Sequence, residues 1–440
     1  MRSRTLILAR FASLSPIFVA LAADTGSAQL AWRELPNAPV STTIRHDDLF
    51  FVDGNTGWVV NVVGEIHRTT DGGDSWELQA QTGELNRCVG FANAGRGWVG
   101  TLTPPNILYE TFDGGETWSL APNVPAGLPG ICGLSVVDEN VVYGAGVFFE
   151  PATILKTTDG GAAWDAISMA PHASTLIDVY FTSPDSGFAV GGLGEFSNST
   201  RSRILFTSDG GASWVTRFAG TRDGEWGWKI SFPSPSVGYV SLERVEGMTN
   251  HFAKTTDGGV TWTDAAFGTP NVQAIGFATE KMGWIGGRLT TTHVTTNGGA
   301  SWEPLLETRN LNRIRFVHEN LGYAAGKTVY KYSDPTVTAA VDPPAPSAGR
   351  RRLQLVGRNP FRTDVALSFE LEREGAATLV VYDAAGARVR VLVDGAQGPG
   401  AQRFVWDGRS DAGQPAASGV YFVRLSATGR EESVRVLLVR

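Results

Sequence analysis

The sequence predicts an all-β protein, a seven-bladed β-propeller followed by a small β-sandwich. Three features of the first three quarters of the chain favour the propeller: a repeated Gly-Gly turn followed by Trp, a repeated Gly-aromatic pair, and alternating apolar residues before each pair. Self-similarity at a period of about 40–50 residues is the signature of propellers, solenoids and arrays.

The repeated turn reads Asp-Gly-Gly or Asn-Gly-Gly, with Trp after a short gap. Gly adopts positive φ at little cost, so this sequence is typical of hairpin turns. We expect the Asp carboxylates to accept hydrogen bonds from N–H groups of their own turn, which is a structural role. The first residues of the six turns are Asp71, Asp113, Asp159, Asp209, Asp257 and Asn297.

The Gly-aromatic pair occurs seven times, once in the variant form Val-Tyr. An apolar residue stands seven positions before each aromatic residue and another two positions earlier, which is the period-2 pattern of a β-strand. Together with the turns, this predicts four short antiparallel strands per repeat, or one propeller blade. The seven pairs are Gly57-Trp58, Gly97-Trp98, Val142-Tyr143, Gly187-Phe188, Gly238-Tyr239, Gly283-Trp284 and Gly322-Tyr323.

The seventh repeat lacks the Gly-Gly turn and the Trp, so its fourth strand is missing. Residues 31–36 resemble the segment 301–306 of the preceding repeat, and we expect them to supply that strand and close the ring. Closure removes exposed sheet edges. The expected domains are a propeller at 31–334, a Pro/Ala linker at 335–350 and a sandwich at 351–440.

The start of the chain indicates an exported protein. Residues 1–28 have the charged start and apolar stretch of a signal peptide. No later segment is long and apolar enough to span a bilayer. The net charge of −7 is concentrated in the propeller and argues against nucleic acid as a partner.

The chain has two cysteines, Cys88 and Cys132. They either form a disulfide or serve as two small buried apolar residues.

After the linker, motifs of a second kind appear in a fixed order: Asn359-Pro360-Phe361, Tyr382 to Val389, Trp406-Asp407-Gly408 and Ser418 to Phe422. This set resembles the Ig-like domain of flagellar hook-capping proteins and is similar to C-terminal sorting domains of the type IX secretion system. The resemblance implies an Ig-like sandwich that serves in sorting or in anchoring at the cell surface.

The propeller turns resemble Asp-box (BNR) repeats. Their form Thr-Thr-Asp-Gly-Gly-x-x-Trp, paired with Gly-Trp-x-x-Gly, is closest to photosystem II assembly factors, with sialidase-like proteins as further relatives. The resemblance covers residues 31–334. It implies the fold strongly and the function weakly, because one fold carries many functions.

No constellation of catalytic residues stands out, and no motif for a metal or cofactor is present, so we expect neither. Glycoside hydrolysis would require two carboxylates that flank the scissile bond. Asp47, Asp48, Asp178 and Glu225 are candidates by position, but the sequence favours solvated surface carboxylates.

A ligand site is expected on the face that carries the longest loops, around the central funnel. Polar and aromatic residues replace the apolar pattern where the first strand of each repeat begins, and Arg beside exposed Trp is typical of interfaces. Ordinary funnel lining with solvated charges is the alternative. The candidate residues are Arg45, Asp48, Arg87, Asp178, Trp226, Trp228, Lys229 and Arg313.

These features predict an exported, non-enzymatic propeller that binds a protein or a glycan at the cell surface. A secreted glycoside hydrolase of the sialidase-like, single-propeller type is the alternative. A third hypothesis is chaperone work like that of the assembly factors, although the sorting-type domain argues against that family's own substrate.

Overall fold

The computed structural model contains two compact units, Met1–Thr338 and Ala339–Arg440. It describes residues 30–43, 45–146, 152–195, 199–245, 247–269, 271–288, 291–333, 353–356, 361, 364–371, 375–383, 387–398, 400–417, 419–427 and 430–438. The expected signal peptide and linker lie outside these residues. The described part of the chain contains strands and turns, and none of it forms a helix that could cross a membrane.

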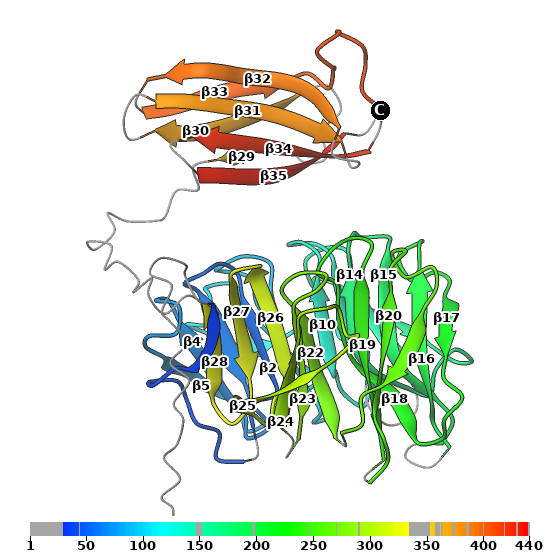
Figure 1. The fold of residues 1–440 in the computed structure, drawn as a ribbon. Coiled ribbons are helices and arrows are strands. Elements are labelled where there is room, and N and C mark those ends of the chain that lie inside the picture. Colours follow the sequence, from blue (N-terminus) through cyan, green and yellow to red (C-terminus); the bar gives the residue numbers. More distant parts are fainter. Residues whose placement is uncertain are drawn as a thin grey trace, which may run out of the picture. The chain divides into compact units, whose positions relative to one another are not determined.

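Seven four-stranded antiparallel sheets make up the first unit (Figure 1), which confirms the predicted seven-bladed propeller. Blade 1 contains β2 (Asp48–Phe51), β3 (Gly57–Val60), β4 (Glu65–Thr69) and β5 (Glu77–Gln81). Blade 2 contains β6 (Asn86–Phe91), β7 (Gly97–Thr101), β8 (Leu108–Thr111) and β9 (Ser119–Leu120). Blade 3 contains β10 (Gly133–Val136), β11 (Val142–Ala145), β12 (Thr153–Thr157) and β13 (Asp165–Ser168).

The next three blades follow the same order. Blade 4 contains β14 (Thr175–Phe181), β15 (Gly187–Leu193), β16 (Arg201–Thr207) and β17 (Val215–Ala219). Blade 5 contains β18 (Glu225–Ser231), β19 (Gly238–Arg244), β20 (His251–Thr255) and β21 (Thr263–Ala266). Blade 6 contains β22 (Val272–Phe277), β23 (Gly283–Gly287), β24 (Thr291–Thr295) and β25 (Glu303–Arg309).

Blade 7 joins the two ends of the propeller sequence. Its strands are β26 (Arg313–His318), β27 (Leu321–Ala325), β28 (Val329–Ser333) and, from the start of the described chain, β1 (Ala31–Glu34). Trp32 is opposite Tyr332 in the antiparallel register of β1 and β28. The first strand of each blade contacts the first strand of the next, and β26 contacts β2, so these inner strands form a closed circle.

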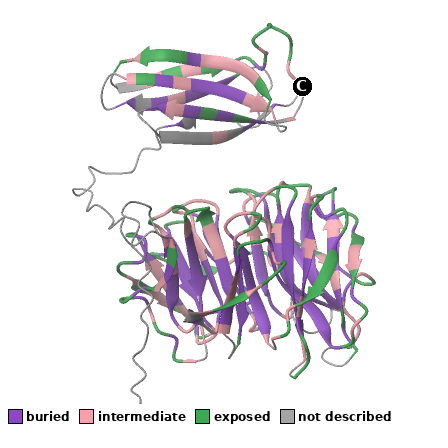
Figure 2. Ribbon diagram, viewed as in Figure 1, coloured by how far each residue is buried: buried purple, intermediate pink, exposed green. Residues whose placement is uncertain are grey.

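Burial follows the order of strands within a blade (Figure 2). The second strands β3, β7 and β11 are buried along their whole length, whereas the fourth strands β9 and β21 are exposed throughout. Cys88 and Cys132 are buried and do not form a disulfide, so they occupy two buried positions.

A Phe at the end of the first strand explains why Gly opens the second strand. In blade 4, Phe181 is directly opposite Gly187, and a Cβ on Gly187 would lie 2.4 Å from the Phe181 ring. The ring therefore lies flat against the glycine backbone. Blade 3 has Val136 opposite Val142 instead, which shows that two medium side chains can replace the Phe and Gly pair.

The other face of each Phe ring packs against the preceding blade. Phe181 stacks on Tyr143 of blade 3 with ring centroids 3.5 Å apart, and Trp214 of its own blade meets its edge at 6.2 Å. Blade 3, with Val136, packs against Trp98 in the same apolar cluster. The equivalent stacked pairs are Tyr323–Phe51, Trp58–Phe91, Phe188–Phe232, Tyr239–Phe277 and Trp284–Phe316.

The Asp-box turns are held by their own side chains. In blade 4, Asp209 Oδ1 accepts hydrogen bonds from Ser213 N (2.9 Å) and Thr207 Oγ1 (2.8 Å), and Oδ2 accepts one from Ser213 Oγ (2.5 Å). These donors lower the pKa of Asp209 to about 2, with the Ser213 hydroxyl as the largest cause. Gly210 and Gly211 have φ of 69° and 89°, which only Gly adopts freely.

The turns also connect neighbouring blades. The carbonyl oxygen of Gly210 in blade 4 accepts hydrogen bonds from Lys156 Nζ (2.8 Å) and Tyr143 OH (3.2 Å) of blade 3. The same arrangement joins blade 5 to blade 6 and blade 7 to blade 1. A turn that is broken therefore weakens a blade interface as well as its own hairpin.

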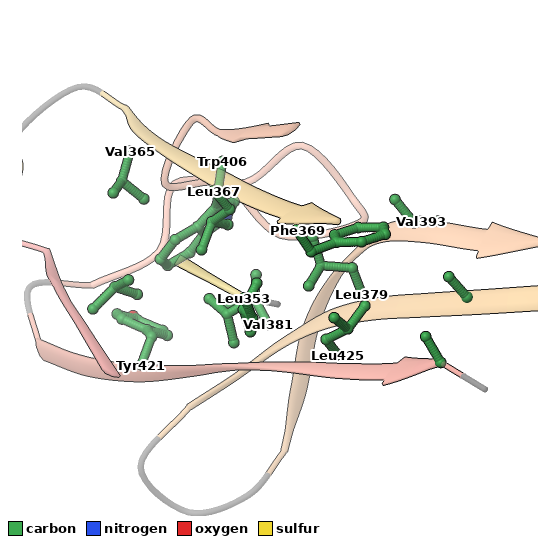
Figure 3. Close-up of a cluster of buried hydrophobic side chains, with 14 of the residues drawn as sticks. Leu353, Val365, Leu367, Phe369, Leu379, Val381, Val393, Trp406, Tyr421 and Leu425 are labelled. Carbon is green, nitrogen blue, oxygen red and sulfur yellow. The ribbon is translucent and has the colours of Figure 1, made fainter. Parts of the chain in front are cut away.

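The second unit is a β-sandwich with an apolar core between its two sheets (Figure 3). One sheet has the order β29 (Gln354–Val356), β30 (Val365–Leu371) and β33 (Gly400–Trp406). The other has the order β32 (Arg388–Gln397), β31 (Gly375–Asp383), β34 (Gly419–Ala427) and β35 (Arg430–Leu438). Trp406 is fully buried in the core, and its Nε1 donates to the carbonyl of Arg409 at 2.9 Å.

The Phe and Gly pair of blade 4 leads to a test by a double-mutant cycle. Gly187→Ala is expected to destabilise the protein by about 1–3 kcal/mol, because the new Cβ overlaps the Phe181 ring. Phe181→Val makes room for that Cβ, as in blade 3, so the double variant should be less destabilised than the sum of the two single variants. Urea unfolding of the three variants measures this coupling, and additive free energies would contradict it.

A second test concerns the contribution of the Asp209 side chain in blade 4 to the stability of the fold. Asp209→Ala is expected to lower the free energy of unfolding, whereas Asp209→Asn should retain most of it, because Asn297 makes the equivalent bonds in blade 6. A carboxylate with a lowered folded-state pKa stabilises the fold above its unfolded pKa of about 4 and loses that effect as the pH falls towards 2. Thermal melts between pH 2 and pH 5 should therefore show a smaller loss for Asp209→Asn than for the parent.

Candidate functional site

The inner strands run side by side around the propeller axis, so residues at the same position along each strand lie in one ring. Ahead of or near the start of these strands, Arg45, Asp47, Arg87, Trp228 and Gln273 line a cavity of about 300 Å³. We call it the arginine cavity. Its remaining lining residues are Thr43, Val62, Leu102 and Arg288.

Two arginines in this cavity compete for one carboxylate. Arg87 Nη1 pairs with Asp47 Oδ1, and both side chains are buried. Arg45 Nε lies farther away, 3.7 Å from the same Asp47 oxygen. Burial is the main cause that lowers the pKa of Arg45 to about 10. The charge of Asp47 opposes this shift, whereas the charges of Arg87 and the exposed Arg288 contribute to it. The positive charge of Arg45 is therefore incompletely compensated.

Trp228 lines the cavity and is held there by contacts with Arg87 and Asn312. The guanidinium carbon of Arg87 lies 5.3 Å from the Trp228 ring centroid, within the range of a cation–π contact. Trp228 Nε1 donates to Asn312 Oδ1 at 2.9 Å, and Asn312 Nδ2 donates to the carbonyl of Asp47 at 2.5 Å. The indole, the amide and the Asp47 backbone thus hold one another in place.

A chain of hydrogen bonds connects Arg45 to a buried carboxyl group that the sequence did not single out. Arg45 Nη1 donates to Gln273 Oε1, and Gln273 Nε2 donates to Glu243 Oε1 at 2.8 Å. Burial raises the pKa of Glu243 to about 7, although the bond from Gln273 and the charge of Arg45 oppose this rise. Glu243 lies near the end of β19, the second strand of its blade. The apolar and polar residues of this strand form no pattern that predicts a polar site.

Farther along the inner strands, four of the predicted site residues form a buried ion cluster. Arg313 donates to Asp178 through both terminal nitrogens, at 2.7 and 2.9 Å, and through Nε to Asp48 at 2.8 Å. These contacts join blades 7, 4 and 1 across the centre of the ring. Burial works against the charged form of Asp178, but Arg313 and Lys229 lower its pKa to about 2.

Lys229 completes this cluster on blade 5. Its side chain is buried, and its Nζ has no hydrogen-bond partner among the described residues. Burial and the charge of Arg313 lower the pKa of Lys229 to about 8, with Asp178 and Asp48 opposing the shift. The cluster thus contains two cations, Arg313 and Lys229, and two carboxylates, Asp48 and Asp178, and all four side chains are buried.

The structure corrects two expectations about exposure. Trp226 and Trp228 were expected to be exposed, but 7% and 4% of their surfaces are accessible, because they pack together with Ile177. Trp228 lines the arginine cavity and Trp226 is absent from its lining. Sequence patterns predicted where these residues lie along the strand, and packing between blades decided their burial.

The expectation of solvated surface carboxylates is also wrong. Asp47, Asp48, Asp178 and Glu225 are all buried. Glu225 is paired with Arg222, whose Nε and Nη2 lie 2.6 and 3.1 Å from its two oxygens. Carboxylates that are neutralised by arginine in this way are poorly suited to donate a proton in glycoside hydrolysis. Within the described ranges, no group of His, Cys, Asp and Glu could hold a metal ion.

Glu243 leads to a test by pH. Its pKa rises from 4.5 in the unfolded chain to about 7 in the folded one, so the folded state binds more protons between these values. Stability should therefore fall as the pH rises from about 5 to about 8, by on the order of 3 kcal/mol for this group. Urea unfolding should show this fall in the parent and not in Glu243→Gln, and parallel pH profiles would contradict it.

Two family models match the chain. Residues 27–168 match the photosynthesis system II assembly factor YCF48, and residues 357–431 match the FlgD Ig-like domain. The second match lies on the β-sandwich. The first covers blades 1 to 3, which contribute Arg45, Asp47 and Arg87 to the arginine cavity.

Two curated relatives extend the likeness over the propeller. The photosystem II assembly lipoprotein Ycf48 of Synechococcus sp. (strain CC9902) is 27% identical over 296 residues, which are 62% of this chain and 79% of the relative. The photosystem II stability/assembly factor HCF136 of Arabidopsis thaliana, a chloroplastic protein, is 24% identical over 343 residues, 71% of this chain and 81% of the relative.

Solved structures share the fold at lower identity. YCF48 bound to D1 peptide has a TM-score of 0.51 at 18% identity and covers 69% of this chain and 96% of that structure. A GH74 xyloglucanase from Xanthomonas campestris has a TM-score of 0.53 at 15% identity. The match covers 77% of this chain and 59% of that structure. The chain is therefore similar to YCF48-type assembly factors in its propeller and to the FlgD Ig-like domain in its sandwich.

Proposed function

We propose that the propeller is a non-enzymatic binding protein that takes a carboxylate-bearing segment of a partner protein in the arginine cavity. The observation that carries this proposal is the charge of the cavity: Arg45, Arg87 and Arg288 line it with the single carboxylate of Asp47. Because Arg87 already occupies Asp47, an incoming carboxylate would find Arg45 and Arg288 available for charge-assisted hydrogen bonds.

The size of the cavity suits part of a polypeptide. Pockets for drug-sized ligands measure about 300–1,000 Å³, so a cavity of about 300 Å³ is at the lower end of that range. It would hold one acidic side chain or a chain terminus, with Val62, Leu102 and Trp228 as apolar walls. The rest of the segment would lie over the loops around the cavity.

The relatives support a protein as the partner. One solved relative of the same fold was determined with a peptide bound, and two curated relatives are assembly factors by name. Asp48 and Asp178 are both paired with Arg313. Paired carboxylates fit a structural role better than the role of an acid or base in hydrolysis, which agrees with a binding protein. By analogy with the peptide-bound relative, the propeller of this chain would bind a peptide segment of its partner.

For the C-terminal unit we propose a role in export or anchoring. The support is the match to the FlgD Ig-like domain, together with the lipoprotein named among the propeller's relatives. Deletion of residues 339–440 should then change where the propeller is found in the native cell without changing its affinity for a peptide. Fractionation of cells that express the two forms measures this, and identical distribution would contradict it.

The binding proposal is tested with an array of fluorescein-labelled hexapeptides. Each peptide with Asp, Glu or a free carboxyl terminus is matched by its Asn, Gln or amidated form, and affinities are measured by fluorescence anisotropy. Carboxylate forms should bind more tightly than their neutral partners. The variant with both Arg45→Met and Arg288→Met should lose about 10-fold in affinity, which is typical of a lost charge-assisted hydrogen bond.

Arg201→Met is the matched control. Arg201 is an exposed arginine outside the cavity lining and pairs with Asp223 at 2.7 Å. It should leave peptide affinity unchanged. Equal binding of acidic and neutral peptides, or an equal loss in the control, would refute the proposal.

A further inference from the structure

A second cavity lies at the other end of the inner strands. It measures about 240 Å³ and is lined mainly by residues at or near the ends of these strands. They are Phe50 and Phe51 on β2, Tyr180 on β14, Ile230 and Ser231 on β18, Phe232 just after it, Phe277 on β22, Arg313 to Val317 on β26 and Tyr323 on β27. The arginine cavity is lined near the strand starts instead. We call the second one the aromatic cavity.

The buried ion cluster separates the two cavities. Along β2, Asp48 precedes Phe50 by two residues, and along β26, Arg313 precedes Arg315 by two. Side chains two apart on a strand point to the same side, so Phe50 and Arg315 follow the cluster towards the far end of the channel. The lining residues differ completely between the cavities, so they can be altered independently.

Aromatic faces dominate this end. Tyr180 of blade 4 stacks on Phe232 of blade 5 with ring centroids 5.3 Å apart, and Phe50, Phe232 and Phe316 are each only partly buried. Val317 adds an exposed apolar side chain at the rim. These partly exposed rings surround a space that can take one further ring or branched side chain.

Arg315 carries a positive charge that its contacts with the described residues compensate only in part. Its guanidinium lies 5.3 Å from the centroid of the Phe50 ring, and 29% of its side chain is exposed. Its ion pair with a described residue is a long one, 3.6 Å to Asp48 Oδ2, while Asp48 is held at 2.8 Å by Arg313. The Nε of Arg315 has no hydrogen-bond partner among the described residues.

The local charge balance is positive as well. Arg313, Arg315 and Lys229 oppose two carboxylates, those of Asp48 and Asp178. Burial and the neighbouring Arg313 lower the pKa of Arg315, which means that its charged form gains from an added anion. An apolar occupant alone would leave this cation desolvated and uncompensated, so an anionic group beside the apolar group fits better.

We propose that the aromatic cavity is a second binding site, which takes an aromatic side chain of a polypeptide with a carboxylate next to it. The ring would pack between Phe50, Tyr180 and Phe232, and the carboxylate would pair with Arg315. At about 240 Å³ the cavity is smaller than pockets for whole drug-sized ligands, so it anchors one side chain. The site is independent of the proposed function of the arginine cavity.

The carboxylate can come from the chain terminus or from a neighbouring Asp, and two probes separate these sources. N-acetylphenylalanine carries the terminal carboxylate, and N-acetyl-Phe-Asp-amide carries a side-chain carboxylate. N-acetylphenylalanine amide is the neutral reference. Titrations of the full chain, followed by ligand-detected NMR, should show at least one carboxylate probe binding about 10-fold more tightly than the reference.

Three variants test the assignment of the site. Arg315→Met should remove the preference for carboxylate and leave binding of the neutral amide unchanged. Phe50→Leu should weaken all probes that bind. Both variants are compared in an Arg45→Met background, which removes carboxylate binding at the arginine cavity and so distinguishes failure here from failure of the proposed function. Arg201→Met, outside both cavities, is the matched control and should leave the probes unaffected.

The melting temperature of each variant is measured first, so that a folding defect is not taken for a lost site. If Phe50→Leu does not fold, Tyr180→Leu takes its place, because that ring lines the opposite wall. In the Arg45→Met background, binding of all three probes with equal affinity, binding that Arg315→Met leaves unchanged, or an equal loss in Arg201→Met would each overturn the proposal.

Discussion

The structure depends on one repeated contact, a Phe ring held between a glycine of its own blade and an aromatic ring of the blade before. Gly187, Phe181 and Tyr143 are one example, with stacked centroids 3.5 Å apart. Each such pair contributes about 0.5–1.5 kcal/mol beyond the area it buries. Every blade interface of the ring except the one at Val136 uses this contact, so it recurs around the propeller.

With the blades held in this way, the inner strands must place polar groups somewhere in a narrow channel. A buried charge is tolerated only when it is paired, and Arg313 pairs with carboxylates from two other blades. Arg313 thereby links Asp48 and Asp178 of two other blades, and both carboxylates are paired inside the ring. The channel residues that the sequence suggested as solvated surface charges therefore form a buried ion cluster.

The two cavities differ in chemistry because the strand ends differ. At the start of the strands, Arg45 and Arg87 share Asp47 beside a single indole, so the arginine cavity is polar and cationic. At the far end, several Phe rings are partly exposed, and two arginines, Arg313 and Arg315, lie among them. Each cavity thus contains arginine side chains, although the protein as a whole has a net charge of −7.

The sequence by itself determined the repeat, the number of blades, the turn chemistry and the sandwich, because Gly-Gly turns and period-2 apolar patterns are local properties of the chain. It also located the ring of polar residues that begins with Asp48. Only the tertiary structure decided which of these residues meet: Arg313 and Asp178 are 135 positions apart, and no local pattern predicts their pairing. Glu243 and Arg315 were missed for the same reason, since burial and charge near a channel arise from blades that are distant in sequence.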